Sequence, residues 1–332
     1  MIVLLCVFSS CNKQQININH VFNRSQVMIY SLYDCIFCDL FGSIMNGGGI
    51  GISSNHQIEL DIHYSVFVNC SVATGYNGGG LSFYVPNGGT CSLEAVCASG
   101  CISQAYTNGE NGQGQFACIH VGQACNLKLD YVSVTQCCPS LVAKRWRSSV
   151  LINGFQSVSN SNYSKNNVEW QSAYTSRDFQ SVLSIYTTIT NNTSSSYSTL
   201  VYYSGTNITI SNMNFINNIQ KGADHGLIRV GYDSPSHAVF KMCIFMKNTI
   251  SSSGLFCLFL GSITIDSCYI DSYTYKSSSP TVLSLLSITE TFSNVHHRTF
   301  WCYAELPLSK PHSAFSVSLP ILTSVFLHPH FL

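Results

Sequence analysis

Short runs in which apolar residues alternate with small polar residues fill the chain from about residue 25 onward, and clusters of turn-forming residues separate them. A strand with one face on a packed interior and the other in water shows this period of two. Long stretches with the period of an amphipathic helix are absent. The pattern predicts an all-β chain. The clearest predicted strands are residues 58–62, 66–68, 81–85, 127–134, 182–186, 207–210, 226–230 and 262–265.

A glycine-rich motif occurs twice in the first third of the chain. Each copy is an asparagine followed by three glycines and a branched apolar residue. Glycine reaches positive φ angles and allows close approach of the backbone, so these tracts are expected where the chain turns a corner. The motif residues are Gly47, Gly48, Gly49 and Ile50 in the first copy, and Gly78, Gly79, Gly80 and Leu81 in the second.

A second motif, Phe-x-x-Asn, occurs at Phe215 and Asn218 and again at Phe245 and Asn248. Ile270 follows Phe245 at a slightly shorter step. If these positions are equivalent, their side chains stack inside the molecule, and each fully buried one contributes about 1.5 to 3 kcal/mol. Three N-terminal residues at equal steps extend the series: Phe37, Phe67 and Cys97.

Both motifs recur at a spacing of about 30 residues, which indicates a solenoid, in which each unit buries its apolar face only by stacking on its neighbours. Units of two or three short strands, stacked in parallel at about 4.8 Å, form a parallel β-helix, and parallel connections are overwhelmingly right-handed. We predict a right-handed parallel β-helix over residues 20–290, with polar runs 157–167 and 191–198 as projecting loops. Residues 1–19 are expected to be a weak or clipped signal segment, and the proline-containing residues 291–332 an irregular tail.

Composition narrows the function classes. Charged residues are 9 % of the chain, compared with roughly 25 % in ordinary soluble proteins. The formal net charge is zero, and the 15 basic residues form no patch, which argues against a nucleic-acid partner. No apolar run reaches the roughly 18 to 20 residues of a membrane-spanning helix. The tract Gly47–Gly51 lacks the spacing of a dinucleotide-binding fingerprint, so no cofactor is predicted.

Sixteen cysteines are distributed unevenly, with twelve before residue 139. Many lie in apolar strand patterns, where a thiol packs as a small apolar group, but disulfides in an oxidising compartment are an open alternative. Cys35 and Cys38 have the spacing of a zinc or redox motif. No second pair or histidine follows at a suitable distance, so packing explains them better and no metal site is predicted.

Six Asn-x-Ser/Thr sequons suit a secreted glycoprotein. The apolar start of the chain resembles the apolar core of a signal peptide, although it lacks the basic residues that precede one. Together these features predict an extracellular or cell-surface location. The candidate glycosylation sites are Asn23, Asn69, Asn162, Asn191, Asn192 and Asn207.

The two motifs resemble the short tandem repeats of polymorphic outer-membrane proteins, Gly-Gly-Ala-Ile/Leu/Val and Phe-x-x-Asn. Here the first motif has glycine where that family favours alanine, and the second occurs intact at Phe215–Asn218 and Phe245–Asn248. The large β-helical surface proteins of parasitic protists carry similar repeats. The resemblance covers roughly residues 20–290 and implies a right-handed β-helix displayed at the cell surface, with adhesion as its usual role.

Catalytic groups are sparse. Glu59, Asp61 and His63 alternate along one predicted strand and share a face, with His56 nearby, so an acid/base or metal site is conceivable there. A solvated strand face is the competing interpretation.

The run Asp224-His225-Gly226, followed by Arg229, resembles elements of polygalacturonases, but the paired aspartates of that family have no counterpart here. We therefore expect a non-enzymatic, adhesin-like scaffold whose partners are carbohydrate or protein surface ligands. The alternatives are a polysaccharide lyase or hydrolase on the same fold, or a piece of a larger repeat protein.

Overall fold

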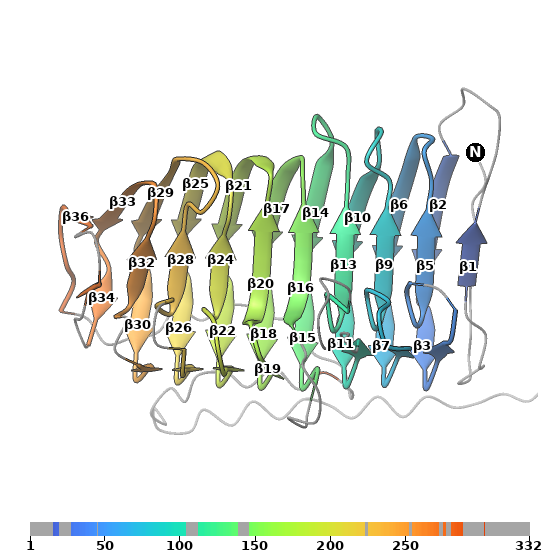
Figure 1. The fold of residues 1–332 in the computed structure, drawn as a ribbon, viewed down its shortest axis with the longest axis horizontal. Helices are drawn as coiled ribbons and strands as arrows, with labels where there is room; N and C mark the ends of the chain where they lie inside the picture. Colours follow the sequence, from blue (N-terminus) through green and yellow to red (C-terminus); the bar gives the residue numbers. More distant parts are fainter. Residues whose placement is uncertain are drawn as a thin grey trace, which may run out of the picture.

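The structure is a computed structural model, and it describes residues 16–19, 28–44, 46–103, 112–138, 146–222, 225–251, 254–271, 275–276, 280–287 and 302. These residues form strands and turns, without a helix, in a parallel β-solenoid of about eight turns. The coils follow one another along the long axis, from β1 at one end to β36 at the other (Figure 1). The predicted parallel β-helix is confirmed. The expected signal segment and tail lie outside the described residues, apart from β1 and Cys302.

Among the described residues the strands form five parallel sheets, three of which run the length of the solenoid. Sheet A contains β1 (Ile16–Asn19), β5 (Ile50–Ser53), β9 (Leu81–Tyr84), β13 (Ala117–His120), β16 (Arg147–Ile152), β20 (Gln171–Arg177), β24 (Leu200–Tyr202), β28 (Ile228–Val230), β32 (Phe256–Leu258) and β35 (Tyr275–Lys276). Sheet B contains β2 (Met28–Tyr33), β6 (Ile58–His63), β10 (Thr90–Glu94), β14 (Asn126–Asp130), β17 (Phe155–Ser159), β21 (Phe179–Ile185), β25 (Gly205–Ser211), β29 (Ser236–Lys241), β33 (Gly261–Asp266) and β36 (Thr281–Val282).

Each coil then turns into a shorter third face. Sheet C contains β3 (Ile36–Cys38), β7 (Val66–Val68), β11 (Cys97–Ser99), β15 (Ser133–Thr135), β18 (Asn162–Ser164), β22 (Thr188–Thr190), β26 (Asn214–Ile216), β30 (Ile244–Met246) and β34 (Tyr269–Ile270). Two small sheets follow it: β4 (Phe41–Gly42), β8 (Ser71–Val72) and β12 (Ile102–Ser103) in the early coils, and β19 (Asn167–Val168), β23 (Thr193–Ser194), β27 (Ile219–Gln220) and β31 (Thr249–Ile250) in the later ones.

The phenylalanines of the repeat stack between neighbouring coils inside the solenoid. The ring centroids of Phe37 and Phe67 lie 4.7 Å apart, and those of Phe215 and Phe245 lie 4.8 Å apart. All four side chains are buried. Such a stacked pair contributes about 0.5 to 1.5 kcal/mol beyond its buried area. The spacing of the phenylalanines therefore reports the length of one coil.

The two glycine tracts lie on adjacent coils, directly before β5 and β9. Gly47 and Gly78 have φ angles of 84° and 72°. The amide of Gly48 donates hydrogen bonds to the carbonyl oxygens of Gly78 and Gly79 at 3.1 and 3.0 Å. A Cβ atom on Gly48 would lie 2.1 Å from the carbonyl oxygen of Gly79, so the backbones approach too closely for any side chain.

The corner between sheets B and C does not depend on glycine, contrary to expectation, although glycines with positive φ occur at other turns, such as Gly226 before β28 and Gly261 at the start of β33. Between sheets B and C each coil turns through one residue with a φ of 48° to 54°, a region that L-residues other than Asn and Asp rarely adopt. Stacking of identical turns on both sides fixes this conformation despite its cost. These corner residues are Asp34, Tyr64, Ala95, Tyr131, Asn160, Tyr186, Asn212, Met242 and Ser267.

The predicted equivalence of Cys97 with Phe67 is wrong by one residue. Ala98 pairs with Phe67, and Cys97 pairs with Val66. Because successive side chains of a strand point to opposite faces, this shift turns Cys97 away from the core. Its sulfur is disulfide-bonded to Cys302, 205 residues along the chain.

The predicted single strand at residues 127–134 is two strands. β14 ends at Asp130 and β15 begins at Ser133, with Tyr131 at the corner between them. The inward positions are Leu127 and Leu129 before the corner and the even-numbered residues 132 and 134 after it. A change of phase in the apolar pattern therefore marks the corner.

The predicted projecting loop at residues 157–167 is also wrong, because this segment contains strands β17 to β19, and residues 191–198 include β23. Several of their polar side chains are buried between coils, among them Asn166 and Ser194, and hydroxyl groups of neighbouring strands line the interior of the same coils. The hydroxyl groups of Tyr174 and Ser184 lie 2.8 Å apart, and those of Tyr174 and Tyr202 lie 3.1 Å apart. Buried polar groups are stable when they are hydrogen-bonded to one another, so a polar sequence here does not mean a surface loop.

The asparagine of the Phe-x-x-Asn motif belongs to an internal ladder at the end of sheet C. Asn218 accepts a hydrogen bond on Oδ1 from the amide of Asn192 at 3.1 Å and donates from Nδ2 to the carbonyl of Ile189 at 2.8 Å. Its own amide donates to Oδ1 of Asn248 at 3.0 Å. The same contacts link the asparagines of successive later coils: Asn166, Asn192, Asn218 and Asn248.

Cysteines occupy the equivalent ladder position in the early coils. Sγ of Cys70 lies 3.4 Å from the carbonyl oxygen of Phe37, and Sγ of Cys101 lies 3.7 Å from that of Phe67. Burial raises the pKa of Cys101, so its thiol stays protonated at neutral pH. Most of the described cysteines are free and buried, as the packing interpretation expects. Cys97 and Cys302 form a disulfide, as the alternative interpretation expects.

Candidate functional site

The predicted acidic strand lies on the outer face of sheet B. Glu59, Asp61 and His63 alternate with buried residues of β6 and are half-buried on one face, as the period of two requires. Nδ1 of His63 lies 3.3 Å from a carboxylate oxygen of Glu94 on the next coil, and the imidazole stacks on Tyr33 at 4.6 Å. Partial burial raises the pKa of Asp61, and His63 opposes that shift.

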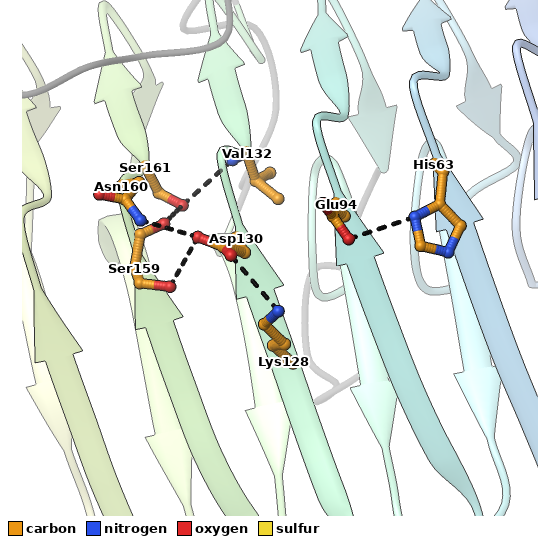
Figure 2. A network of polar contacts seen from close by, with 8 residues as sticks. All are labelled: His63, Glu94, Lys128, Asp130, Val132, Ser159, Asn160 and Ser161. Carbon is orange, nitrogen blue, oxygen red and sulfur yellow. Dashed lines mark hydrogen bonds and ion pairs between the residues drawn. The ribbon is translucent and has the colours of Figure 1, made fainter.

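A second polar group, separate from the pair of His63 and Glu94, lies on the next coils of sheet B (Figure 2). The carboxylate of Asp130 lies 3.3 Å from Nζ of Lys128 and accepts hydrogen bonds from Oγ of Ser159 at 2.8 Å and Nδ2 of Asn160 at 3.0 Å. Burial disfavours ionisation of Asp130, but these hydrogen bonds and the charge of Lys128 outweigh it and hold the pKa below its ordinary value. At the corner that follows β17, Oγ of Ser161 donates a hydrogen bond to the carbonyl of Ser159 at 2.7 Å.

These polar contacts link neighbouring coils of sheet B. Each charged group contacts a neighbouring polar group on its own coil or the next, as cross-strand pairs do in any sheet. Among the described residues, no group of three or more His, Cys, Asp or Glu side chains is placed to hold a metal ion.

A second concentration of chemistry lies on the outer face of sheet A, in the later coils. Three arginines from different coils lie there beneath two rows of aromatic rings. We call this group the arginine–aromatic cluster, and it consists of Arg147, Arg177, Arg229, Trp146, Trp170, Tyr197, His225, Tyr203, Tyr232 and Phe259.

One aromatic row precedes the strands of sheet A, with one ring per coil. Each ring stacks on the next. The distance between ring centroids is 4.2 Å from Trp146 to Trp170, 4.4 Å from Trp170 to Tyr197, and 4.0 Å from Tyr197 to His225. All four rings are half-buried. The regular rise of the solenoid repeats one ring position at the stacking distance, so the row is a product of the fold.

The other row follows the strands at their carboxyl ends. Tyr203 contacts Tyr232 at 5.5 Å, and Tyr232 contacts Phe259 at 5.6 Å, both edge to face. Tyr203 is buried, whereas Tyr232 and Phe259 are each 47 % exposed. These two rings therefore present apolar surface to solvent at the border of the cluster.

Arg147 begins β16 and is only 3 % exposed. Its Nε donates to Gln171 Oε1 at 2.8 Å, and its Nη1 donates to Gln113 Oε1 at 2.6 Å. The guanidinium carbon lies 4.8 Å from the ring centroid of Trp170. Burial lowers the pKa of Arg147, Tyr203 opposes that shift, and the positive charge of Arg177 adds to it.

Arg229 lies at the centre of β28 and is 2 % exposed. Its guanidinium carbon lies 4.2 Å from the ring centroid of Tyr232 and 4.1 Å from that of Phe259, and Nη1 lies 3.1 Å from Nδ1 of His225. Nε of Arg229 is buried without a hydrogen-bond partner. Stacking on aromatic faces stabilises a cation, but it does not neutralise the charge.

The three guanidinium groups converge on the ring of Tyr203. Their carbon atoms lie 5.8, 5.2 and 5.9 Å from its centroid for Arg147, Arg177 and Arg229 respectively. None of the three forms an ion pair with a carboxylate of any described residue. Neighbouring buried charges of one sign are unfavourable unless an opposite charge compensates them.

A shallow hollow of about 240 Å³ lies at the other end of sheet A, over β5 and β9. It carries no charged side chain, so it offers little to orient a ligand. Its lining consists of Ile44, Asn46, Gly51, Ile52, Ser53, Tyr76 and Ser82.

The sequence pointed to only two residues of the cluster. It singled out His225 and Arg229, which the structure brings into contact, but it missed Arg147 and Arg177 on other coils. Two further predicted residues, Asn23 and Asp224, lie outside the described residues.

The predicted glycosylation sites differ in accessibility. Asn69 and Asn207 are exposed, and Asn191 is half-buried. Asn162 and Asn192 are fully buried, and Nδ2 of Asn192 donates to the carbonyl of Tyr163 at 2.7 Å. A glycan on either buried side chain is incompatible with the folded coil, whereas Asn69 and Asn207 stay candidates.

Comparison with known proteins gives no assignment. No family model matches the chain, and neither the curated proteins nor the solved structures include a match. The part of the chain that the structure describes holds no helix long and apolar enough to cross a membrane. The resemblance to polymorphic outer-membrane proteins stays a prediction from two short motifs.

Proposed function

We propose that this chain is a secreted or surface-displayed binding scaffold, adhesin-like in role, that holds a carbohydrate or protein ligand on the outer face of its solenoid. A stack of parallel coils exposes long, flat, rigid faces, and proteins of this architecture use such faces for binding. Polymorphic outer-membrane proteins, which the sequence resembles, support the same role by analogy.

The arginine–aromatic cluster is the observation that carries this proposal. Tryptophan, tyrosine and arginine are the residues most enriched at the energetic centres of binding surfaces. Their planar side chains offer a large contact area with little conformational freedom to lose. The cluster combines all three types on adjacent coils, and Tyr232 and Phe259 expose nearly half of their surface.

A matched pair of variants tests the proposal. Phe259 and Phe155 are both 47 % exposed, but Phe259 borders the cluster whereas Phe155 lies on sheet B. We expect Phe259→Ala to weaken binding to glycan arrays and to intact cells at least about tenfold, and Phe155→Ala to leave it unchanged. Equal loss in both variants would place the binding surface elsewhere. Release of reducing or unsaturated sugar ends by the wild-type chain would support the enzymatic alternative instead.

Secretion leads to a separate prediction about glycans. When the chain is expressed through a eukaryotic secretory pathway, we expect glycopeptide mass spectrometry to find glycans at Asn69 or Asn207 and none at Asn162 or Asn192. Only the first two side chains are exposed in the folded chain. Occupied Asn192 in folded, monomeric protein would contradict the structure of the internal ladder.

A further inference from the structure

We propose that the arginine–aromatic cluster is an anion site that recognises a carboxylate or sulfate group of an acidic saccharide. This inference deepens the proposed function, on which it rests, by naming the chemistry of the ligand. It starts from three positive charges that the described part of the protein leaves without a carboxylate.

The hydrogen bonds inside the cluster leave its charge intact. Arg147 is held by the side-chain oxygens of Gln113 and Gln171, which are neutral acceptors and orient the guanidinium without compensating it. A buried charge without a compensating opposite charge is strongly destabilising. For stability alone, a carboxylate beside the arginines or apolar side chains in their place would therefore be better. A bound anion can supply the charge that no described carboxylate provides.

Unused donors point the same way. Nε of Arg229 and Nε of Arg177 are both buried without a hydrogen-bond partner. Arginine presents its N–H groups in a planar fork that matches two oxygens of a carboxylate, sulfate or phosphate. Buried donors that lack partners are rare in folded proteins, and a bound ligand group is one way to satisfy them.

The surroundings favour a saccharide as the bearer of the anion. The half-exposed rings of Tyr232 and Phe259 border the site on one side, and the row from Trp146 to His225 borders the other. Flat aromatic faces next to a charged group suit a sugar ring, which has apolar C–H faces and carries its carboxylate or sulfate at the edge. A polymer of such rings extends along the coils and meets both rows.

Binding to hyaluronan, dextran sulfate and uncharged dextran tests the proposal, with isothermal titration calorimetry as the readout. We expect one or both charged polymers to bind and dextran not to bind. Hyaluronan carries carboxylates and dextran sulfate carries sulfates, so the two arms distinguish the sources of the anion. Binding should weaken as sodium chloride rises, because added ions screen the charges.

Arg177→Gln removes one charge from the cluster at its partly exposed member, and Lys128→Gln removes one from the outer face of sheet B as a charge-matched control. We expect about tenfold to hundredfold weaker binding in Arg177→Gln and no more than about a twofold change in Lys128→Gln. Circular dichroism checks that both variants fold. Arg177→Lys, which keeps the charge and loses the fork, should show an intermediate affinity.

Equal effects of the two charge-removing variants would overturn the inference, because nonspecific attraction would then explain the binding. Dextran binding that Phe259→Ala abolishes and Arg177→Gln leaves intact would also overturn it, while the proposed scaffold function would stand. Binding of polyglutamate in place of every acidic saccharide would identify a peptide ligand and refute the saccharide. If the chain binds no saccharide, no polyglutamate and no cell surface, the inference and the proposed function both fail.

Discussion

Replacing Asn218 by alanine removes a side chain from the middle of the asparagine ladder while leaving the fold of its coil otherwise intact. Asn218 is fully buried. Its Oδ1 accepts from the amide of Asn192, and its Nδ2 donates to the carbonyl of Ile189. Truncation leaves both backbone groups facing a small cavity that lacks partners for them.

The expected cost follows from those two groups. A buried donor or acceptor that loses its partner costs about 1 to 3 kcal/mol, so Asn218→Ala should lower the free energy of unfolding by roughly 2 to 5 kcal/mol. Asn207→Ala, an exposed change on β25, should cost less than about 0.5 kcal/mol. Asn218→Cys should fall between them, because the thiol retains the weak donor that Cys70 and Cys101 provide in the early coils.

Urea unfolding followed by circular dichroism measures all three variants against the parent chain, with the shift of midpoint multiplied by the slope giving the change. If Asn218→Ala and Asn207→Ala differ by less than about 0.5 kcal/mol, the ladder does not stabilise the stacking of coils and the argument is refuted.

Three more predictions use other features. Gly48→Ala should lower the free energy of unfolding by about 1 to 3 kcal/mol in the same urea assay, because its Cβ would lie 2.1 Å from the carbonyl oxygen of Gly79. An unchanged free energy of unfolding would contradict the close approach of the two backbones. Cys302→Ser should cost roughly 2 to 5 kcal/mol, since the bond to Cys97 closes a separation of 205 residues, and unchanged stability under reducing conditions would show that the bond does not contribute. The lowered pKa of Asp130 means that its contribution is present above the unfolded pKa and lost as pH falls through the folded one, so stability should decline in acid. Asp130→Asn should flatten that decline in unfolding measured between about pH 5 and 3, and an unchanged slope would refute the assignment.

The sequence revealed the fold where the same residues recur on adjacent coils. Gly47 and Gly78, and Phe215 and Phe245, are visible because stacking demands the same side chain at the same place: the glycines by close approach, the phenylalanines by face-to-face contact. Two clear pairs sufficed to predict a parallel solenoid.

The middle coils escaped prediction for two physical reasons. In sheet C, Ala98 pairs with Val134, and Val134 pairs with Tyr163. The first coil is therefore longer than the second, and the repeat of about 30 residues is lost there. The interior of the next coils also changes from apolar side chains to hydroxyl groups and amides, as at Ser184. Polarity alone cannot distinguish an internal hydrogen-bonded row from a surface loop.

The candidate site was less predictable still. Arg147, Arg177 and Arg229 are widely and unequally separated along the chain, so no local motif unites them. They meet at Tyr203 only because β16, β20, β24 and β28 are consecutive strands of sheet A. An unusual clue was available in principle, since a ring precedes sheet A on four successive coils, but the irregular coil lengths obscure its spacing.

The change of the interior from thiol and apolar ladders in the early coils to amide and hydroxyl ladders in the middle has a thermal consequence. Exposure of apolar surface raises the heat capacity of unfolding, whereas exposure of polar surface lowers it. The two regions should therefore have stability curves of different curvature, with the early coils losing more of their cohesion on cooling. The two regions of one continuous solenoid would then each have their own temperature of greatest stability.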